Sequence, residues 1–247
     1  VVWNWLANGA GSSNTDGSIT STVSASTTSG FSVVKWTGSG GNATIGHGLG
    51  AVPKMIMIKS LANTTSWMVY TAMTGNNSEL ALNSSATATT SSTAWQDTDP
   101  TSSVFYVAGG AGDGVNASGD YVAYVFAEKQ GFSKFGSYTG TANADGAFIY
   151  TGFKPAWIMM KKTAGSGYHW FVFDNKRDGY NNSNKRFEAS SSAAEADTSP
   201  AGNIDILSNG FKIRTTDGHI ADAGEYIYIA FAEEPLVASN GVPATAR

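Results

Sequence analysis

The chain carries one pattern of residues twice. Gly-Phe-Ser occurs at 30–32 and again at 131–133. Matched positions lie between 101 residues apart (Gly30 and Gly131) and 106 residues apart (Ser103 and Asn209). Five blocks keep this order, which chance would not produce, and their period is too long for a solenoid. The blocks are 30–38, 50–59, 67–70, 103–105 and 119–128 in the first copy, and 131–140, 152–161, 170–173, 209–211 and 224–233 in the second.

This duplication divides the chain into four parts. We expect one repeat at 30–129 and a second repeat at 130–235. Residues 1–29 are rich in Ser, Thr and Gly, and we interpret them as an N-terminal arm or linker with one strand at 18–25. Residues 236–247 are expected to form a short extended tail. The chain begins at Val1 rather than Met, as expected of a processed chain or of part of a longer one.

Strand signals dominate both copies, and the apolar spacing of amphipathic helices is nearly absent. Many short strands separated by Gly-rich turns predict an all-β fold, a tandem duplication of a β-sandwich unit of jelly-roll or lectin-like type. The apolar runs 55–58 and 121–127 do not alternate with polar residues, so we expect both faces of these strands to be covered. The expected strands are 31–36, 54–59, 67–71, 79–82, 104–107 and 121–128, then 133–138, 147–150, 156–161, 170–174, 187–189, 210–214 and 225–233.

Composition excludes several classes of function. Net charge is −4, and the scattered Lys and Arg form no basic stripe for nucleic acid. Cysteine is absent, which excludes disulfides, Cys-ligated zinc and thiol nucleophiles. No run reaches the roughly 18 apolar residues that a membrane-spanning helix needs. Because the chain has no cysteine, its stability must come from packing or oligomerisation.

Several matched blocks also resemble a known family. The segments 47–56, 134–140 and 225–233, together with the run 14–24, resemble virion structural proteins of marine bacteriophages, those of cyanophages above all. In that family such segments form the C-terminal part of larger tail-fibre or tail-associated proteins, sometimes behind a lectin-like domain. The resemblance implies a multimeric component on the outside of the virion, and it lends no catalytic residues.

No motif predicts catalysis, a metal or a cofactor. The three histidines are far apart in sequence, and His47 and His219 are interpreted as solvated turn residues. The paired carboxylates Asp97 and Asp99, or Asp174 and Asp178, raise the alternative of a glycosidase. Their surroundings are typical of turn caps and of a solvated charged loop, so we expect no enzyme activity.

Aromatic residues in polar loops are the best candidates for stacking on sugars. They fall in three clusters: Trp95 with Gln96 and Asp97, Tyr168 with His169, and Tyr180 alone. The alternative role for each is to anchor a loop or to contact another chain. Trp3 and Trp5 are expected to contact a neighbouring chain, since the N-terminal segment cannot form a core of its own.

These observations predict a non-enzymatic virion protein, a tail fibre or receptor-binding module that contacts host-surface glycan or protein. The expected partners are other virion proteins and further copies of the chain, and the resemblance supplies the number three for the oligomer. The alternatives are a capsid decoration or cement protein and, third, a tailspike-like glycan hydrolase.

Overall fold

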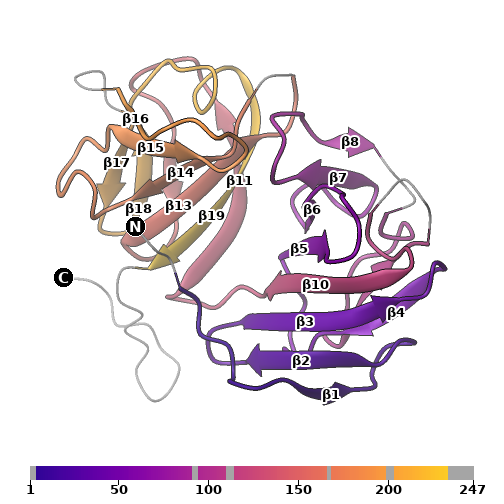
Figure 1. The fold of residues 1–247 in the computed structure, drawn as a ribbon. Coiled ribbons are helices and arrows are strands. Elements are labelled where there is room, and N and C mark those ends of the chain that lie inside the picture. The colour runs from indigo at the N-terminus through magenta and orange to yellow at the C-terminus, as the bar shows by residue number, and fades with distance from the viewer. Residues whose placement is uncertain (1–3, 91–93, 110–113, 166–167, 199–202, 233–247) are drawn as a thin grey trace. The chain divides into compact units, whose positions relative to one another are not determined.

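The computed structural model describes residues 4–90, 94–109, 114–165, 168–198 and 203–232. Every regular element among these residues is a β-strand, and no helix long and apolar enough to cross a membrane is present in them. The chain forms two compact units (Figure 1). Unit 1 comprises Val1–Leu82 and Ala88–Glu128, and unit 2 comprises Asn83–Thr87 and Lys129–Arg247.

Unit 1 is a sandwich of a large and a small antiparallel sheet. The large sheet has the order β1-β2-β3-β10-β5-β6-β7-β8, and the small sheet pairs β4 with β9. The strands of unit 1 are β1 (Ser12–Asn14), β2 (Ser21–Ser26), β3 (Phe31–Gly38), β4 (Ala43–Gly46), β5 (Met55–Ser60), β6 (Met68–Thr71), β7 (Ser78–Ala81), β8 (Thr89–Thr90), β9 (Val104–Val107) and β10 (Gly119–Phe126).

Unit 2 repeats this plan. Its large sheet has the order β11-β19-β13-β14-β15-β16, and its small sheet has the order β12-β18-β17. The strands of unit 2 are β11 (Ser133–Gly140), β12 (Phe148–Tyr150), β13 (Pro155–Lys162), β14 (Phe171–Asp174), β15 (Lys185–Glu188), β16 (Ala196–Asp197), β17 (Ile204–Leu207), β18 (Gly210–Ile213) and β19 (Gly224–Ala232).

Corresponding aromatic side chains join the two sheets inside each unit. In unit 1, Trp36 stacks on Tyr121 with 5.3 Å between ring centroids and meets Phe105 of the small sheet edge-on at 5.8 Å. In unit 2, Tyr138 stacks on Tyr226 at 4.9 Å and meets Phe211 edge-on at 6.4 Å. Such offset and edge-on pairs stabilise a core beyond the area that they bury. The all-β sandwich prediction is therefore confirmed, whereas the common origin of the two units by duplication stays a prediction.

Burial of the central strands differs between the units. In β10 the buried residues Tyr121, Ala123 and Val125 alternate with half-buried ones, as in a strand with one wetter face. In β19 every residue from Tyr226 to Ala232 is buried. The expectation that both faces of such strands are covered is thus met fully in β19 and only in part in β10.

The N-terminal segment corrects the interpretation of 1–29 as an arm or linker, whereas the strand expected at 18–25 corresponds to β2. β2 pairs with β3, and the side chain of Val23 enters the core of unit 1. The ring of Trp5 lies 5.8 Å from that of Phe126 and 6.3 Å from that of Phe31. Trp5 therefore packs within its own unit. Trp3 and the expected tail 236–247 lie outside the described residues.

One lysine occupies an equivalent place in each unit. Lys59 of β5 lies beside the loop that follows this strand, and its Nζ donates to the carbonyl of Thr65 at 2.8 Å. Lys161 of β13 donates to the carbonyls of Ser85 (2.9 Å) and Tyr168, and its side chain is fully buried. Burial lowers the pKa of Lys161 to about 8.

We expect Lys161→Met to remove a pH dependence of stability. An unfolded lysine has a pKa of about 10.4, so between pH 8 and pH 10 the unfolded chain binds more protons than the folded chain. The free energy of unfolding of the wild type should therefore rise with pH, by at most about 1.4 kcal/mol per pH unit from this group. Urea unfolding of both proteins between pH 7 and pH 10 measures the difference in slope. Lys59→Met serves as the control, and identical slopes for wild type and Lys161→Met would contradict the expectation.

Candidate functional site

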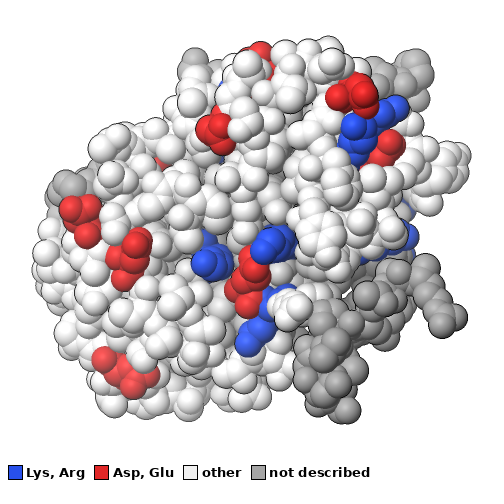
Figure 2. Space-filling model, turned by 180° about the vertical axis from the view of Figure 1, so that it is seen from behind, with Lys and Arg blue, Asp and Glu red and all other residues white. Residues whose placement is uncertain are grey.

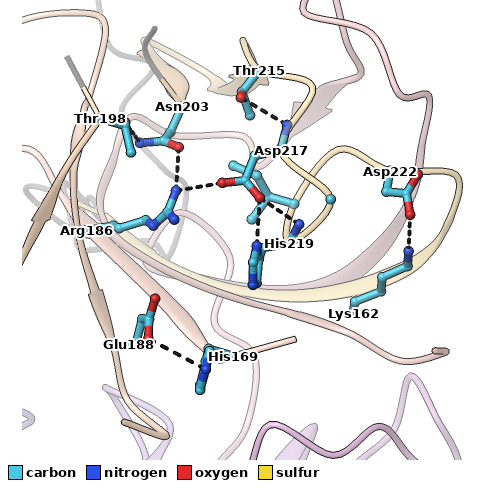
Figure 3. A network of polar contacts seen from close by, with 12 residues as sticks. Lys162, His169, Arg186, Glu188, Thr198, Asn203, Thr215, Asp217, His219 and Asp222 are labelled. Atoms are coloured by element: carbon cyan, nitrogen blue, oxygen red, sulfur yellow. Dashed lines mark hydrogen bonds and ion pairs between the residues drawn. The ribbon is translucent and has the colours of Figure 1, made fainter. Parts of the chain in front are cut away.

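Unit 2 contains a network of charged side chains built around Arg186 of β15 (Figure 3). The guanidinium lies 4.1 Å from the ring centroid of Phe171 and is 10% exposed. Its Nη1 donates to Asp217 Oδ2 at 2.9 Å and to Asn203 Oδ1 at 3.0 Å. A charge held this far from water needs these acceptors, so the arginine and Asp217 depend on each other.

Asp217 also holds His219. Its Oδ1 accepts hydrogen bonds from His219 Nδ1 at 2.7 Å and from the backbone N–H of His219 at 2.9 Å. The hydrogen bond from the ring keeps the pKa of the Asp217 carboxyl well below its usual range, against the opposing effect of burial, and Arg186 adds to the lowering. The His219 ring stacks on Phe171 at 4.9 Å. His219 is therefore an ordered part of the network, which corrects its interpretation as a solvated turn residue.

The predicted pair Tyr168 and His169 lies at the margin of this network. His169 stacks on His219 with 6.3 Å between centroids, and its Nδ1 lies 2.8 Å from Ser190 Oγ. Lys162 Nζ lies 4.3 Å from the centroid of the Tyr168 ring and 2.8 Å from Asp222 Oδ2. Burial opposes the charged form of Lys162, but the hydrogen bonds to Asp222 and Tyr168 raise its pKa.

Most polar atoms of this network are paired within it, although the buried Nε of Arg186 has no hydrogen-bond partner among the described residues. Both rings are partly exposed, with side-chain exposures of 29% for His169 and 33% for His219. Within the described parts of the chain, no group of three His, Asp or Glu residues could hold a metal ion. The network holds β14, β15 and the loop of Asp217 together, and we interpret it as structural.

A pocket of about 510 Å³ lies elsewhere on unit 2. Tyr180, one of the predicted sugar-contact residues, lines it and is 84% exposed. The remaining lining residues are Lys154, Asn175, Lys176, Gly179, Asn181, Ser183 and Ile206. The wall thus combines an aromatic ring with amide, hydroxyl and ammonium groups, the mixture that fixes a polar ligand in a concave site.

The loop that carries Tyr180 is held at several points. Arg177 donates to Asp174 at 2.7 Å, and the guanidinium lies 3.5 Å from the ring centroid of Phe187. Asn181 pairs with the backbone of Ile206 on the edge of β17, through its Nδ2 at 3.0 Å and its Oδ1 at 2.9 Å. Asp174 is 4% exposed, so the loop is anchored rather than solvated as the sequence suggested. These contacts preorganise the pocket wall.

Asn175 is unusual among the lining residues. Its backbone N–H donates to Ala156 at 3.0 Å, but its buried Oδ1 accepts no hydrogen bond from any described residue. An unsatisfied buried acceptor costs about 1–3 kcal/mol, so each one calls for an explanation. This amide is the feature of the pocket that the pattern of residues could not reveal.

The structure buries the ring of Trp95, the aromatic residue predicted to stack on a sugar in unit 1. Trp95 is only 2% exposed, its Nε1 donates to the Ser78 carbonyl at 3.0 Å, and its ring meets Tyr70 edge-on. Gln96 Nε2 donates to the carbonyls of Ala43 and Val107, whereas Asp97 is exposed. The Trp95 ring therefore has no free face for a sugar, and this corrects the prediction. The polar neighbours suggested a solvated loop, but Gln96 turns inward to bond the small sheet.

His47 also differs from expectation, since its ring is fully buried. Its Nδ1 accepts from the backbone N–H of Leu49 at 3.2 Å, and its Nε2 lies 3.2 Å from the carbonyl of Thr101. Burial lowers the pKa of His47. Through these two contacts, the buried His47 ring stabilises the turn of unit 1 in which it lies.

Comparison with known proteins gives one family. A family model described as a domain of unknown function, DUF7483, matches residues 1–235. No curated protein matches the chain. No solved structure matches it.

Proposed function

The chain belongs to the DUF7483 family, and we propose that it is a non-enzymatic attachment module that binds glycan in the Tyr180 pocket of unit 2. The resemblance to phage virion proteins supports a place on the outside of a virion, in a tail fibre or receptor-binding structure. There the ligand would be a glycan on the host surface.

The observation that carries the proposal is the exposure of Tyr180 beside polar groups. The Tyr180 ring is 84% exposed, so its apolar faces contact water. A ligand that stacks on the ring would remove this apolar surface from water, which is favourable. One face of a sugar ring is apolar, whereas its hydroxyls need donors and acceptors. Asn175 and Ser183 line the same pocket and carry an amide and a hydroxyl, whereas the Asn181 amide already bonds the Ile206 backbone.

The lining of the pocket also carries charge. Lys154 and Lys176 both line the pocket, and Asp and Glu are missing from its lining. Most of the face shown in Figure 2 is uncharged, and most Lys and Arg on it lie next to Asp or Glu. Two ammonium groups line this pocket, so a comparison of glycans with and without carboxylate or sulfate groups tests whether their charge contributes to binding.

We expect Tyr180→Ala to weaken binding of acidic polysaccharides at least about tenfold, equivalent to roughly 1.4 kcal/mol, because the stacking surface is lost. Tyr180→Phe keeps the ring and should bind within about threefold of wild type. Asp97→Ala, in the exposed loop of unit 1, is the control that should change nothing. Calorimetric titration with alginate, heparin and dextran compares acidic with neutral ligands. Wild-type failure to bind any of them, or undiminished binding by Tyr180→Ala, would contradict the proposal.

A further inference from the structure

The edges of the two large sheets are unequal. Within the described residues, three of the four edges end in very short strands: β1 has 3 residues, β8 has 2 and β16 has 2. The fourth edge is β11, which has 8 residues. Natural proteins keep exposed edge strands short or charged because a long free edge pairs with other strands. β11 carries one charged residue, Lys134, and no proline.

Unit 1 shows what covers the equivalent edge. β3 corresponds to β11, since Trp36 pairs with Tyr121 as Tyr138 pairs with Tyr226. β3 is not an edge strand: β2 pairs with it antiparallel, with Thr22 opposite Lys35 and Ser26 opposite Phe31. The edge of β3 is therefore closed by a strand of the same chain, whereas no described strand takes this place beside β11.

The register identifies the backbone groups on the open edge. Ala232 donates its N–H to the carbonyl of Phe132, so this pair faces inward between β11 and β19. Along an antiparallel strand, the backbone N–H and C=O groups of successive residues point alternately toward one neighbouring strand and away from it. The backbone N–H and C=O groups of Ser137 and Thr139 must then point away from β19, and both residues are exposed.

The described residues also leave the neighbouring small sheet of unit 2 uncovered. In unit 1, Ile19 bridges to Ile45 of β4, and an added side chain at Gly46 would collide with Asn14. The N-terminal segment therefore lies over β4. Ile149 of β12 faces Phe211 as Ile45 faces Phe105, which makes Phe148 and Tyr150 the counterparts of Thr44 and Gly46. These two aromatic residues are 46% and 64% exposed.

We infer that β11 pairs antiparallel with β11 of a second copy of this chain, forming one sheet that is continuous across a two-fold axis. An antiparallel strand is its own complement, so one surface serves both copies and the contact closes on itself. A two-fold axis at Gly136 places Lys134 opposite Tyr138 and not opposite a second lysine, so like charges are kept apart.

The same contact would explain why the side chains of Phe148 and Tyr150 are exposed in the single chain. In unit 1 a single segment closes both the β3 edge and the β4 strand. A strand and its flanking chain from a second copy would cover both places on unit 2 in the same way. Exposed aromatic side chains beside a free sheet edge are typical of such interfaces. The Tyr180 pocket is not involved, so this inference does not depend on the proposed glycan binding.

Sedimentation of the full chain with Ser137→Pro tests the pairing. Proline at 137 lacks the backbone N–H that points to the free edge, but this N–H makes no hydrogen bond to β19. The fold should therefore be kept, while pairing of another strand with this edge is prevented. We expect wild type to contain an even number of chains at micromolar concentration, Ser137→Pro to lose this pairing, and Ser137→Ala to keep it. Trimers joined in pairs by this two-fold contact would sediment as hexamers and also support the inference. Circular dichroism of all three proteins confirms that the fold is unchanged.

Hydrogen exchange at the Ser137 and Thr139 amides provides a second measurement. Pairing predicts that both amides are protected at high protein concentration and exchange quickly on dilution. A monomer or a trimer that Ser137→Pro leaves unchanged would overturn the inference. Amides that are protected at every concentration in a monomer would also overturn it, since the chain itself would then cover the edge.

Discussion

Asp217→Ala is expected to lower the free energy of unfolding of unit 2 by about 3 kcal/mol. The carboxylate accepts hydrogen bonds from Arg186 at 2.9 Å and from His219 at 2.7 Å. Without it, the guanidinium stays against Phe171 with Asn203 as its remaining acceptor among the described residues, and its charge is largely shielded from water. Removing one partner of a buried ion pair costs far more than the pair itself contributes, because the other charge is left uncompensated. Urea denaturation at pH 7 measures the loss.

Asp145→Ala is the matched control for this change. Asp145 also lies near two cations, Lys212 at 2.9 Å and Arg214 at 3.7 Å, but its side chain is 81% exposed. Exposed ion pairs are screened by water, so we expect no measurable change in unfolding free energy. Equal effects of the two substitutions would contradict the structural role of the Asp217 network.

The effect of Asp217→Ala should depend on pH in one direction. The pKa of Asp217 is held well below its usual range in the folded protein, whereas an unfolded aspartate has a pKa of about 3.9. A depressed carboxyl pKa stabilises the fold above the unfolded pKa, and this stabilisation is lost as pH falls toward the folded pKa. The difference between wild type and Asp217→Ala should therefore be constant above pH 5 and shrink below about pH 4.

Phe211→Ala is expected to cost about 3–5 kcal/mol of unfolding free energy. Phe211 is fully buried, and its ring meets Tyr138 at 6.4 Å and Tyr228 at 5.4 Å, joining the small sheet to the large one. Truncation removes apolar contact from both sheets and leaves a cavity that the surrounding strands cannot fill. The loss is measured from urea unfolding curves followed by near-ultraviolet circular dichroism.

Phe148→Ala on the adjacent strand β12 is the control for Phe211→Ala. Phe148 is 46% exposed and points away from the core that Ile149 enters. We expect a loss below about 1 kcal/mol when unfolding is measured at submicromolar protein concentration. A Phe148→Ala effect as large as that of Phe211→Ala would mean that the sandwich core has been assigned to the wrong face of the small sheet.

Local periodicity predicted the elements that pack against one another. The runs at 55–58 and 121–127 became β5 and β10, and their counterparts became β13 and β19. The strands β4 and β17 were not predicted, since Ala43–Gly46 and Ile204–Leu207 are short and sit between turn residues. The predicted boundary at 129–130 lies one residue after the point where unit 1 ends at Glu128.

Site residues were harder to predict because exposure is set by tertiary contacts. Trp95 and Tyr180 both stand in polar loops, yet one is 2% exposed and the other 84%. The difference arises from the small sheet of unit 1. Its backbone carbonyls accept hydrogen bonds from Gln96, and the neighbouring Trp95 lies in the core. The Arg186–Asp217 pair was missed, since residues 31 positions apart give no local signal of contact.

The all-β class and the order of the main strands could be predicted from the sequence, because both follow from side-chain alternation and turn residues along the chain. Which edges of the sheets are closed depends on tertiary contacts. Residues 1–29 are interpreted from the sequence as an arm or linker with one strand at 18–25, but β2 pairs with β3, β1 pairs with β2, and Val23 is buried. Backbone hydrogen bonding is available to any sequence and leaves little trace in composition. The open edge of β11 and the closed edge of β3 are therefore properties of the fold rather than of the residues that form them.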